Sequence, residues 1–151
     1  MAKYKINETL AILLLLPKLS KQYIDQVEIN TLIEIYKITT GKDREEIFEI
    51  IKKGSWSIEG WLNLYLMLDE PNFKEITFIK INESEASFQQ IYNTYKKVPN
   101  SSHLKQYFEM RLLNTANTFN ENKIIFEDND IPLSSRYLAF LEMRSLINKN
   151  M

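Results

Sequence analysis

His103 is the single histidine of the chain, and it is the first residue to test for acid–base chemistry. A serine or cysteine nucleophile needs an adjacent base, most often a histidine. The sequence has no cysteine, and His103 falls in the first turn of a predicted helix with no recognised motif around it. We therefore expect an exposed or capping histidine. The absence of cysteine excludes catalysis by a thiol, a serine–histidine pair is disfavoured, and we expect no enzymatic activity.

The densest acidic cluster, Glu127-Asp128-Asn129-Asp130, could in principle bind a divalent metal ion. A calcium-binding loop counted from Asp128 would need a glycine at position 133 and a glutamate at position 139. The sequence has Leu133 and Ala139 at these positions. Residues 127–130 are therefore interpreted as a solvated turn, and no metal ligand or cofactor is assigned. A metal-dependent enzyme that uses this turn is the weakest of the alternatives.

The dipeptide Gly41-Lys42 matches the end of a Walker loop, which binds phosphate groups. That loop also needs a glycine where Tyr36 stands, and a serine or threonine where Asp43 stands. The pattern instead predicts a helix that ends at Gly41, in the left-handed conformation common at such ends, and a second helix that begins beyond it.

Nucleic-acid binding is the alternative function with the most support in the sequence. The predicted helices at 31–40 and 43–53 could form a helix-turn-helix, but the second carries four acidic against three basic residues, which disfavours contact with phosphates. Lys96 and Lys97 follow Tyr92 and Tyr95, a mixture typical of single-strand binders. They are the nucleic-acid candidates, although lysines are also favoured at a helix C-terminus.

The composition predicts a mainly α-helical fold for residues 1–151 as a single domain. Three glycines, four prolines and nineteen isoleucines against two valines favour helices over a large sheet. We expect a compact bundle of about six to eight short helices, with a minor two-stranded β element at 77–81 and 123–126. No internal repeat is recognised. The expected helices are 7–16, 18–27, 31–40, 43–53, 58–68, a segment from 82–85 to 98, one from 101–102 to 119, and 132–147.

The apolar run Leu10–Leu16 raises the possibility of a signal peptide or a membrane anchor. Asn7 and Glu8 interrupt its approach, no cleavage site follows Pro17, and the run is far shorter than the ~20 residues that cross a bilayer. We expect a buried helix, no membrane contact and a cytoplasmic location, or an intracellular or virion-associated one for a phage product.

Aromatic residues are abundant, with two tryptophans, eight tyrosines and eight phenylalanines. Such side chains fill cores, and they also anchor protein interfaces. Three predicted helices have wider apolar faces than a surface helix needs to bury, at Leu10–Leu16, 58–68 and 132–147, so part of this surface could meet another chain. The interface candidates are Trp56, Trp61, Tyr65, Tyr137, Phe140 and Met143.

These observations favour a non-catalytic protein–protein interaction or assembly protein. It could be a structural subunit or an adaptor of a larger complex, or an inhibitor of another protein, and it could act as an oligomer. Isoleucine, asparagine and lysine are all frequent, which is typical of AT-rich genomes and would suit a phage or mobile-element product. A nucleic-acid-binding regulator is the alternative.

Overall fold

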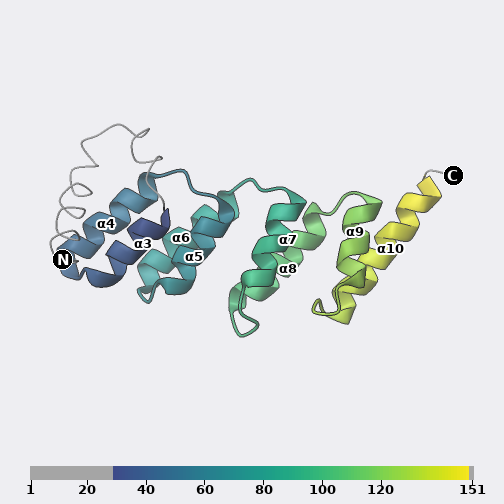
Figure 1. Cartoon of the computed structure of the whole chain (residues 1–151). Coiled ribbons are helices and arrows are strands. Elements are labelled where there is room, and N and C mark those ends of the chain that lie inside the picture. The colour runs from purple at the N-terminus through teal and green to yellow at the C-terminus, as the bar shows by residue number, and fades with distance from the viewer. Residues whose placement is uncertain (1–28, 150–151) are drawn as a thin grey trace. The chain divides into compact units, whose positions relative to one another are not determined.

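The computed structural model describes residues 29–149, and these residues form helices and loops without any strand (Figure 1). The predicted mainly α-helical fold is therefore confirmed. The helices expected at 7–16 and 18–27 lie outside the described residues. The helices are α3 (Ile29–Ile38), α4 (Gly41–Lys53), α5 (Ile58–Met67), α6 (Pro71–Glu83), α7 (Phe88–Lys97), α8 (His103–Thr115), α9 (Phe119–Glu127) and α10 (Leu133–Lys149).

The chain divides into two compact units between Ser84 and Glu85. In the first unit α3 packs against α4 and α5 against α6, and α3 also contacts α5. In the second unit α7 packs against α8 and α9 against α10, and α8 also contacts α10. Over residues 29–149, each unit thus contains two consecutive helical pairs that pack against one another. The expectation that residues 1–151 form one domain stays a prediction.

The helical pairs follow one another at a regular interval along the chain. Their first helices begin at residues 29, 58, 88 and 119, so successive pairs begin 29 to 31 residues apart. The first residue of each of these helices is a large apolar one, and the eighth is aromatic. The first positions are Ile29, Ile58, Phe88 and Phe119, and the eighth positions are Tyr36, Tyr65, Tyr95 and Phe126.

Hydroxyl side chains start three of these first helices. Ser57 accepts a hydrogen bond from the Gly60 N–H at 3.1 Å, and so fixes the beginning of α5. Ser87 with Gln90 forms a full capping box at the start of α7. Thr118 with Glu121 forms another at α9. Each box satisfies backbone N–H groups that have no partner within their own helix.

The helix ends near Gly41 and Pro71 agree only in part with those that the sequence predicts. Gly41 has a φ of 59°, so the predicted left-handed conformation is confirmed, but α3 already ends at Ile38 and Gly41 is the first residue of α4. The helix expected at 58–68 ends at Met67, one residue earlier than the sequence predicts. Pro71 is the first residue of α6, where its missing N–H costs nothing.

The strand expected at 77–81 is wrong, because these residues belong to α6. β-branched residues favour strands only weakly, and packing overrides that preference. The Thr77 hydroxyl donates to the Phe73 carbonyl one turn earlier, at 2.7 Å. Thr77 and Ile81, four residues apart, are the buried residues of the helix. Buried residues spaced by four positions are typical of a helix, whereas a strand would bury every second residue.

The strand expected at 123–126 is also wrong, and so is the continuous helix expected up to residue 119. Helix α8 ends at Thr115, and the capping box of Thr118 and Glu121 starts α9 directly afterwards. The Asn122 side chain donates to the Thr118 carbonyl at 2.9 Å and supports that first turn. Local capping therefore decides the conformation of the short apolar run that ends at Phe126.

Gly54 gives the indole of Trp56 its place at the end of α4. The Trp56 Nε1 donates to the Ile51 carbonyl at 2.7 Å, and a Cβ on Gly54 would overlap the indole ring. We expect Gly54→Ala to displace the ring and to lower the free energy of unfolding by about 1–2 kcal/mol. Urea titrations followed by circular dichroism measure this loss. Trp56→Phe is measured beside it, because this variant removes the indole Nε1 and its hydrogen bond but leaves Gly54 in place. Equal free energies of unfolding of Gly54→Ala and wild type would contradict the close contact between Gly54 and the indole.

Candidate interaction surfaces

Helix α10 presents large apolar side chains to solvent. Its buried residues are the small Ser135 and Ala139. On the other side of the helix, Leu133 is 74% exposed and Tyr137 is 58% exposed. Phe140 and Ile147 lie on the same side, because residues spaced by four, three and seven positions follow one face of an α-helix. Several large apolar residues of this helix are therefore exposed beside its polar ones, whereas two small residues face the core.

A residue of α9 extends this apolar face. The ring centroids of Phe126 and Phe140 are 5.6 Å apart, so the two aromatic side chains touch while both remain partly exposed. We call this set the α9–α10 apolar surface. It consists of Phe126, Leu133, Tyr137, Phe140 and Ile147.

Polar contacts hold α10 in place with this surface outward. The Ser135 hydroxyl donates to the Glu109 carboxylate of α8. The Arg136 Nε donates to the Phe126 carbonyl at the end of α9, at 3.0 Å. Both contacts come from the first turn of α10, so they set which side of the helix faces its neighbours. The exposure of the large residues is therefore a built feature of the second unit.

The interface candidates of the first unit serve its own packing. Trp61 is 5% exposed and belongs to the core. Trp56 is half-buried and bonded to the end of α4. Tyr65 is also half-buried, and the Lys74 Nζ of α6 lies 5.3 Å from the centroid of its ring. These three aromatic residues are largely occupied within unit 1.

The candidates of the second unit are placed differently. Tyr137 and Phe140 lie together on the exposed side of α10, and Met143 is half-buried. Sequence reasoning missed Phe126 and Leu133 as members of this surface. A signal for Leu133 was present, since positions 133, 140 and 147 are seven residues apart and all carry large apolar residues. The small Ser135 and Ala139 mark the opposite, buried side.

Lys96, a nucleic-acid candidate, is bound to the acidic turn. Its Nζ lies 2.9 Å from the Oδ2 atoms of both Asp128 and Asp130. The Tyr92 hydroxyl donates to the Asp128 Oδ2 at 2.6 Å, and the Asp130 N–H donates to the Asp128 Oδ1 at 2.9 Å. The positive charge of Lys96 is thus compensated inside unit 2. Lys97, the other candidate, is exposed.

This network shifts the protonation equilibria of its members. Burial by itself raises the pKa of Asp128, but hydrogen bonds from Tyr92, Lys96 and the Asp130 N–H outweigh it and hold that pKa below its usual value. Burial and the hydrogen bond to Asp128 raise the pKa of Tyr92 to about 12. The carboxylate bonds raise the pKa of Lys96. The network is therefore most stable with Asp128 ionised and Tyr92 neutral.

The acidic turn does not gather metal ligands in the part of the chain that the structure describes. Asp128 and Asp130 both point their carboxylates at an ammonium group, and no group of three or more histidine, aspartate or glutamate side chains is close enough to hold an ion among residues 29–149. The carboxylates of Asp128 and Asp130 instead form ion pairs with Lys96.

The chain has no significant match among models of known protein families, curated proteins or solved structures. Over residues 29–149, no helix combines the length and the apolar character needed to cross a membrane.

Proposed function

We propose that the protein works by binding another protein chain through the α9–α10 apolar surface. The observation that carries this proposal is the exposure of large apolar residues on the side of α10 that faces away from its own core. A contiguous apolar patch on a folded unit is typical of an interaction site. Tyr137 and Phe140 supply the aromatic anchors that dominate the binding energy of many interfaces.

The architecture supports the same proposal. Consecutive helical pairs of similar length are the building plan of helical-repeat proteins, many of which bind partners along the surface of their pairs. The pair α9–α10 offers a surface of this kind through its exposed apolar side chains. The helical pairs add a likeness of fold only, and the exposed side chains carry the proposal.

Nucleic-acid binding receives less support. A sequence-independent nucleic-acid site needs several uncompensated positive charges, because neutralised phosphates supply most of the affinity. Lys96 is bonded to two carboxylates, and its neighbour Tyr95 is buried in the core. The aromatic-plus-basic mixture at the end of α7 is therefore used for packing and for an ion pair.

The test compares capture of partners by the wild-type protein and by a Tyr137→Arg/Phe140→Arg double variant, each tagged and expressed in the cells that naturally make the protein. Hot-spot aromatics cost about 2 kcal/mol or more each when lost, so recovery of the specific partner should fall at least about tenfold. If the partner is a second copy of the chain, light scattering during size-exclusion chromatography should show an oligomer for the wild-type protein and a monomer for the double variant.

The matched control places the same charges elsewhere on exposed apolar residues. Ile79 on α6 and Met110 on α8 are exposed to a similar degree and lie off the proposed surface. The Ile79→Arg/Met110→Arg variant should retain the partner or the oligomer. Equal loss in both variants, or retention in both, would overturn the proposal, provided that circular dichroism shows both variants folded.

A further inference from the structure

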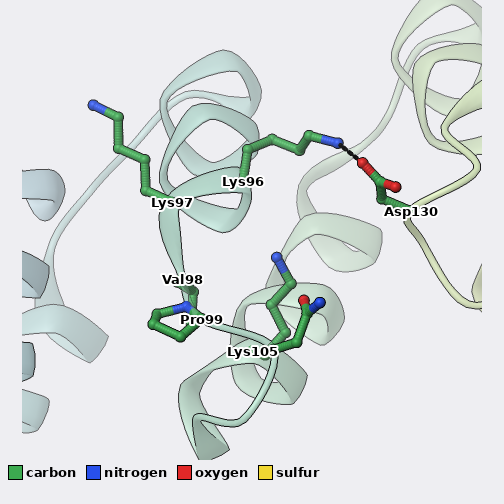
Figure 2. A pocket seen from close by; sticks show the side chains of 7 residues that line it. Lys96, Lys97, Val98, Pro99, Lys105 and Asp130 are labelled. Atoms are coloured by element: carbon green, nitrogen blue, oxygen red, sulfur yellow. Dashed lines mark hydrogen bonds and ion pairs between the residues drawn. The ribbon is translucent and has the colours of Figure 1, made fainter.

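The second unit contains an open pocket of about 420 Å³ between the end of α7 and the start of α8 (Figure 2). Val98 and Pro99 form an apolar wall, and Lys96, Lys105 and Asp130 contribute charged groups. In Figure 2 the Lys105 ammonium points toward the Lys96–Asp130 pair, whereas the Lys97 ammonium points away from it. Three lysines thus line the pocket, of which Lys96 is paired with carboxylates and Lys97 turns its ammonium away from that pair, as Figure 2 shows.

Lys105 is held without a carboxylate partner among the described residues. Its Nζ donates to the Tyr95 carbonyl at 2.7 Å and lies 3.8 Å from the centroid of the Tyr95 ring. These contacts use one N–H donor and one face of the ammonium group, which has three donors. Burial, and then the positive charge of Lys96, lower the pKa of Lys105. A half-buried cation in this state would gain from a nearby negative charge.

We propose that this pocket binds a small oxyanion, a phosphate or a carboxylate group, through the ammonium groups of Lys105 and Lys96. Lys105 provides the main contact. Lys96 turns partly toward the ligand, because Asp128 alone can hold its ammonium and the Asp130 carboxylate is 80% exposed and free to leave. Charge-assisted hydrogen bonds of this kind are about twice as strong as neutral ones.

The carboxylate of Asp130 competes with the incoming anion for Lys96. Its removal should therefore strengthen binding, while removal of the Lys105 charge should abolish it. These opposite effects separate the proposal from a general attraction of anions to lysine-rich surfaces. Such an attraction would respond equally to Lys97, which carries the same charge next to the pocket.

The experiment titrates ¹⁵N-labelled protein with inorganic phosphate, and separately with acetate, at constant ionic strength set by chloride. The amide signals of residues 98–105 should shift with saturation. Lys105→Met should raise the dissociation constant at least about tenfold, Lys97→Met should change it less than about threefold, and Asp130→Asn should lower it a few fold. The anion that binds with the lower dissociation constant shows whether the pocket prefers a phosphate or a carboxylate group.

A second readout keeps the result independent of folding. The pKa of Lys105, measured from its ¹³Cε signal, should rise when the anion is bound, because a bound negative charge stabilises the ammonium form. Unsaturable shifts for both anions would overturn the proposal. So would a dissociation constant that is the same in Lys105→Met as in wild type, or a weaker affinity in Asp130→Asn.

Discussion

Replacing Trp61 with alanine is expected to lower the free energy of unfolding by about 3–5 kcal/mol, the usual cost of removing a large aromatic side chain from a core. Trp61 is 5% exposed, and its neighbours Leu62 and Leu64 are buried as well. The truncated side chain would leave a cavity in the centre of the first unit. Typical domains are stable by only 5–15 kcal/mol, so a large part of the stability would be lost. Urea denaturation followed by far-ultraviolet circular dichroism measures the effect.

Tyr137→Ala is the control for this prediction. The side chain of Tyr137 is mostly exposed, so its loss should change the free energy of unfolding by less than about 0.5 kcal/mol. Both residues are interface candidates in the sequence, and the structure gives them opposite roles. A small effect for Trp61→Ala together with a large one for Tyr137→Ala would contradict the assignment of core and surface.

The sequence predicts the helices best where a local signal marks their ends. Ser57 and Ser102 cap helices that begin one residue later, and Gly41 adopts its expected left-handed conformation. These signals act within one turn, so they are visible without the rest of the fold. The predictions at 77–81 failed for the opposite reason. A strand or a helix there is decided by the burial of Thr77 and Ile81 against the neighbouring helix.

The separation of core from surface could not be predicted in the same way. Helix α5 is apolar on most of its sides, so its pattern does not show which aromatic residue is covered. Trp61 and Tyr65 are four residues apart on one face, yet only Trp61 is fully buried, while Tyr65 is covered in part by Lys74. Which neighbour lies over each residue depends on where the next helix packs.

The regular interval of the helical pairs is visible in the structure and was not recognised in the sequence. The eighth residues of the four first helices share size and aromatic character but not the residues around them. Tyr36 and Tyr95 are buried at this position, whereas Tyr65 and Phe126 are covered only in part, and several residue types can meet such packing requirements. The pairs therefore keep their length of about 30 residues without keeping their sequence.

The contact between Lys96 and the acidic turn is the clearest feature of the second unit that the sequence conceals. Lys96 and Asp128 are 32 residues apart, and nothing local to either one indicates the other. In the sequence, Lys96 belongs to a basic and aromatic group, and Asp128 belongs to a solvated turn. The packing of α7 within unit 2 brings them together, and their interpretation changes from two candidate sites to one structural network.

Asp128→Ala is expected to lower the free energy of unfolding of the second unit by about 2–3 kcal/mol. The Asp128 side chain is 8% exposed, and its carboxylate accepts hydrogen bonds from Tyr92, Lys96 and the Asp130 N–H. A hydrogen bond to a charged group contributes about 1.5–3 kcal/mol, and the hydroxyl of Tyr92 would also lose its partner. Asp130→Ala is the matched control. Its side chain is mostly exposed, so the loss should stay below about 1 kcal/mol.

The same network gives the stability difference between wild type and Asp128→Ala a defined dependence on pH. The pKa of Asp128 is lowered on folding, so its contribution is complete above the unfolded value of about 3.9 and disappears as the pH falls through the lower folded value. The pKa of Tyr92 is raised to about 12, so its contribution is complete below about 10, the unfolded value, and is lost as the pH rises through 12.

Urea titrations at a series of pH values should therefore give a difference in the free energy of unfolding between wild type and Asp128→Ala that is constant between about pH 4 and pH 10. The difference should become smaller below about pH 4 and above about pH 10. The acidic and the alkaline end of this pH range test different atoms. The acidic end reports the ionised carboxylate, and the alkaline end reports the two groups that donate to it, the Tyr92 hydroxyl and the Lys96 ammonium, whose pKa values are both raised. In Tyr92→Phe the alkaline narrowing should become smaller, because only Lys96 still loses its proton there. The acidic narrowing should remain, because Lys96 still binds the carboxylate. A difference that falls steadily across neutral pH would mean that other groups titrate with folding, and would contradict the assignment of this network to Asp128 and Tyr92.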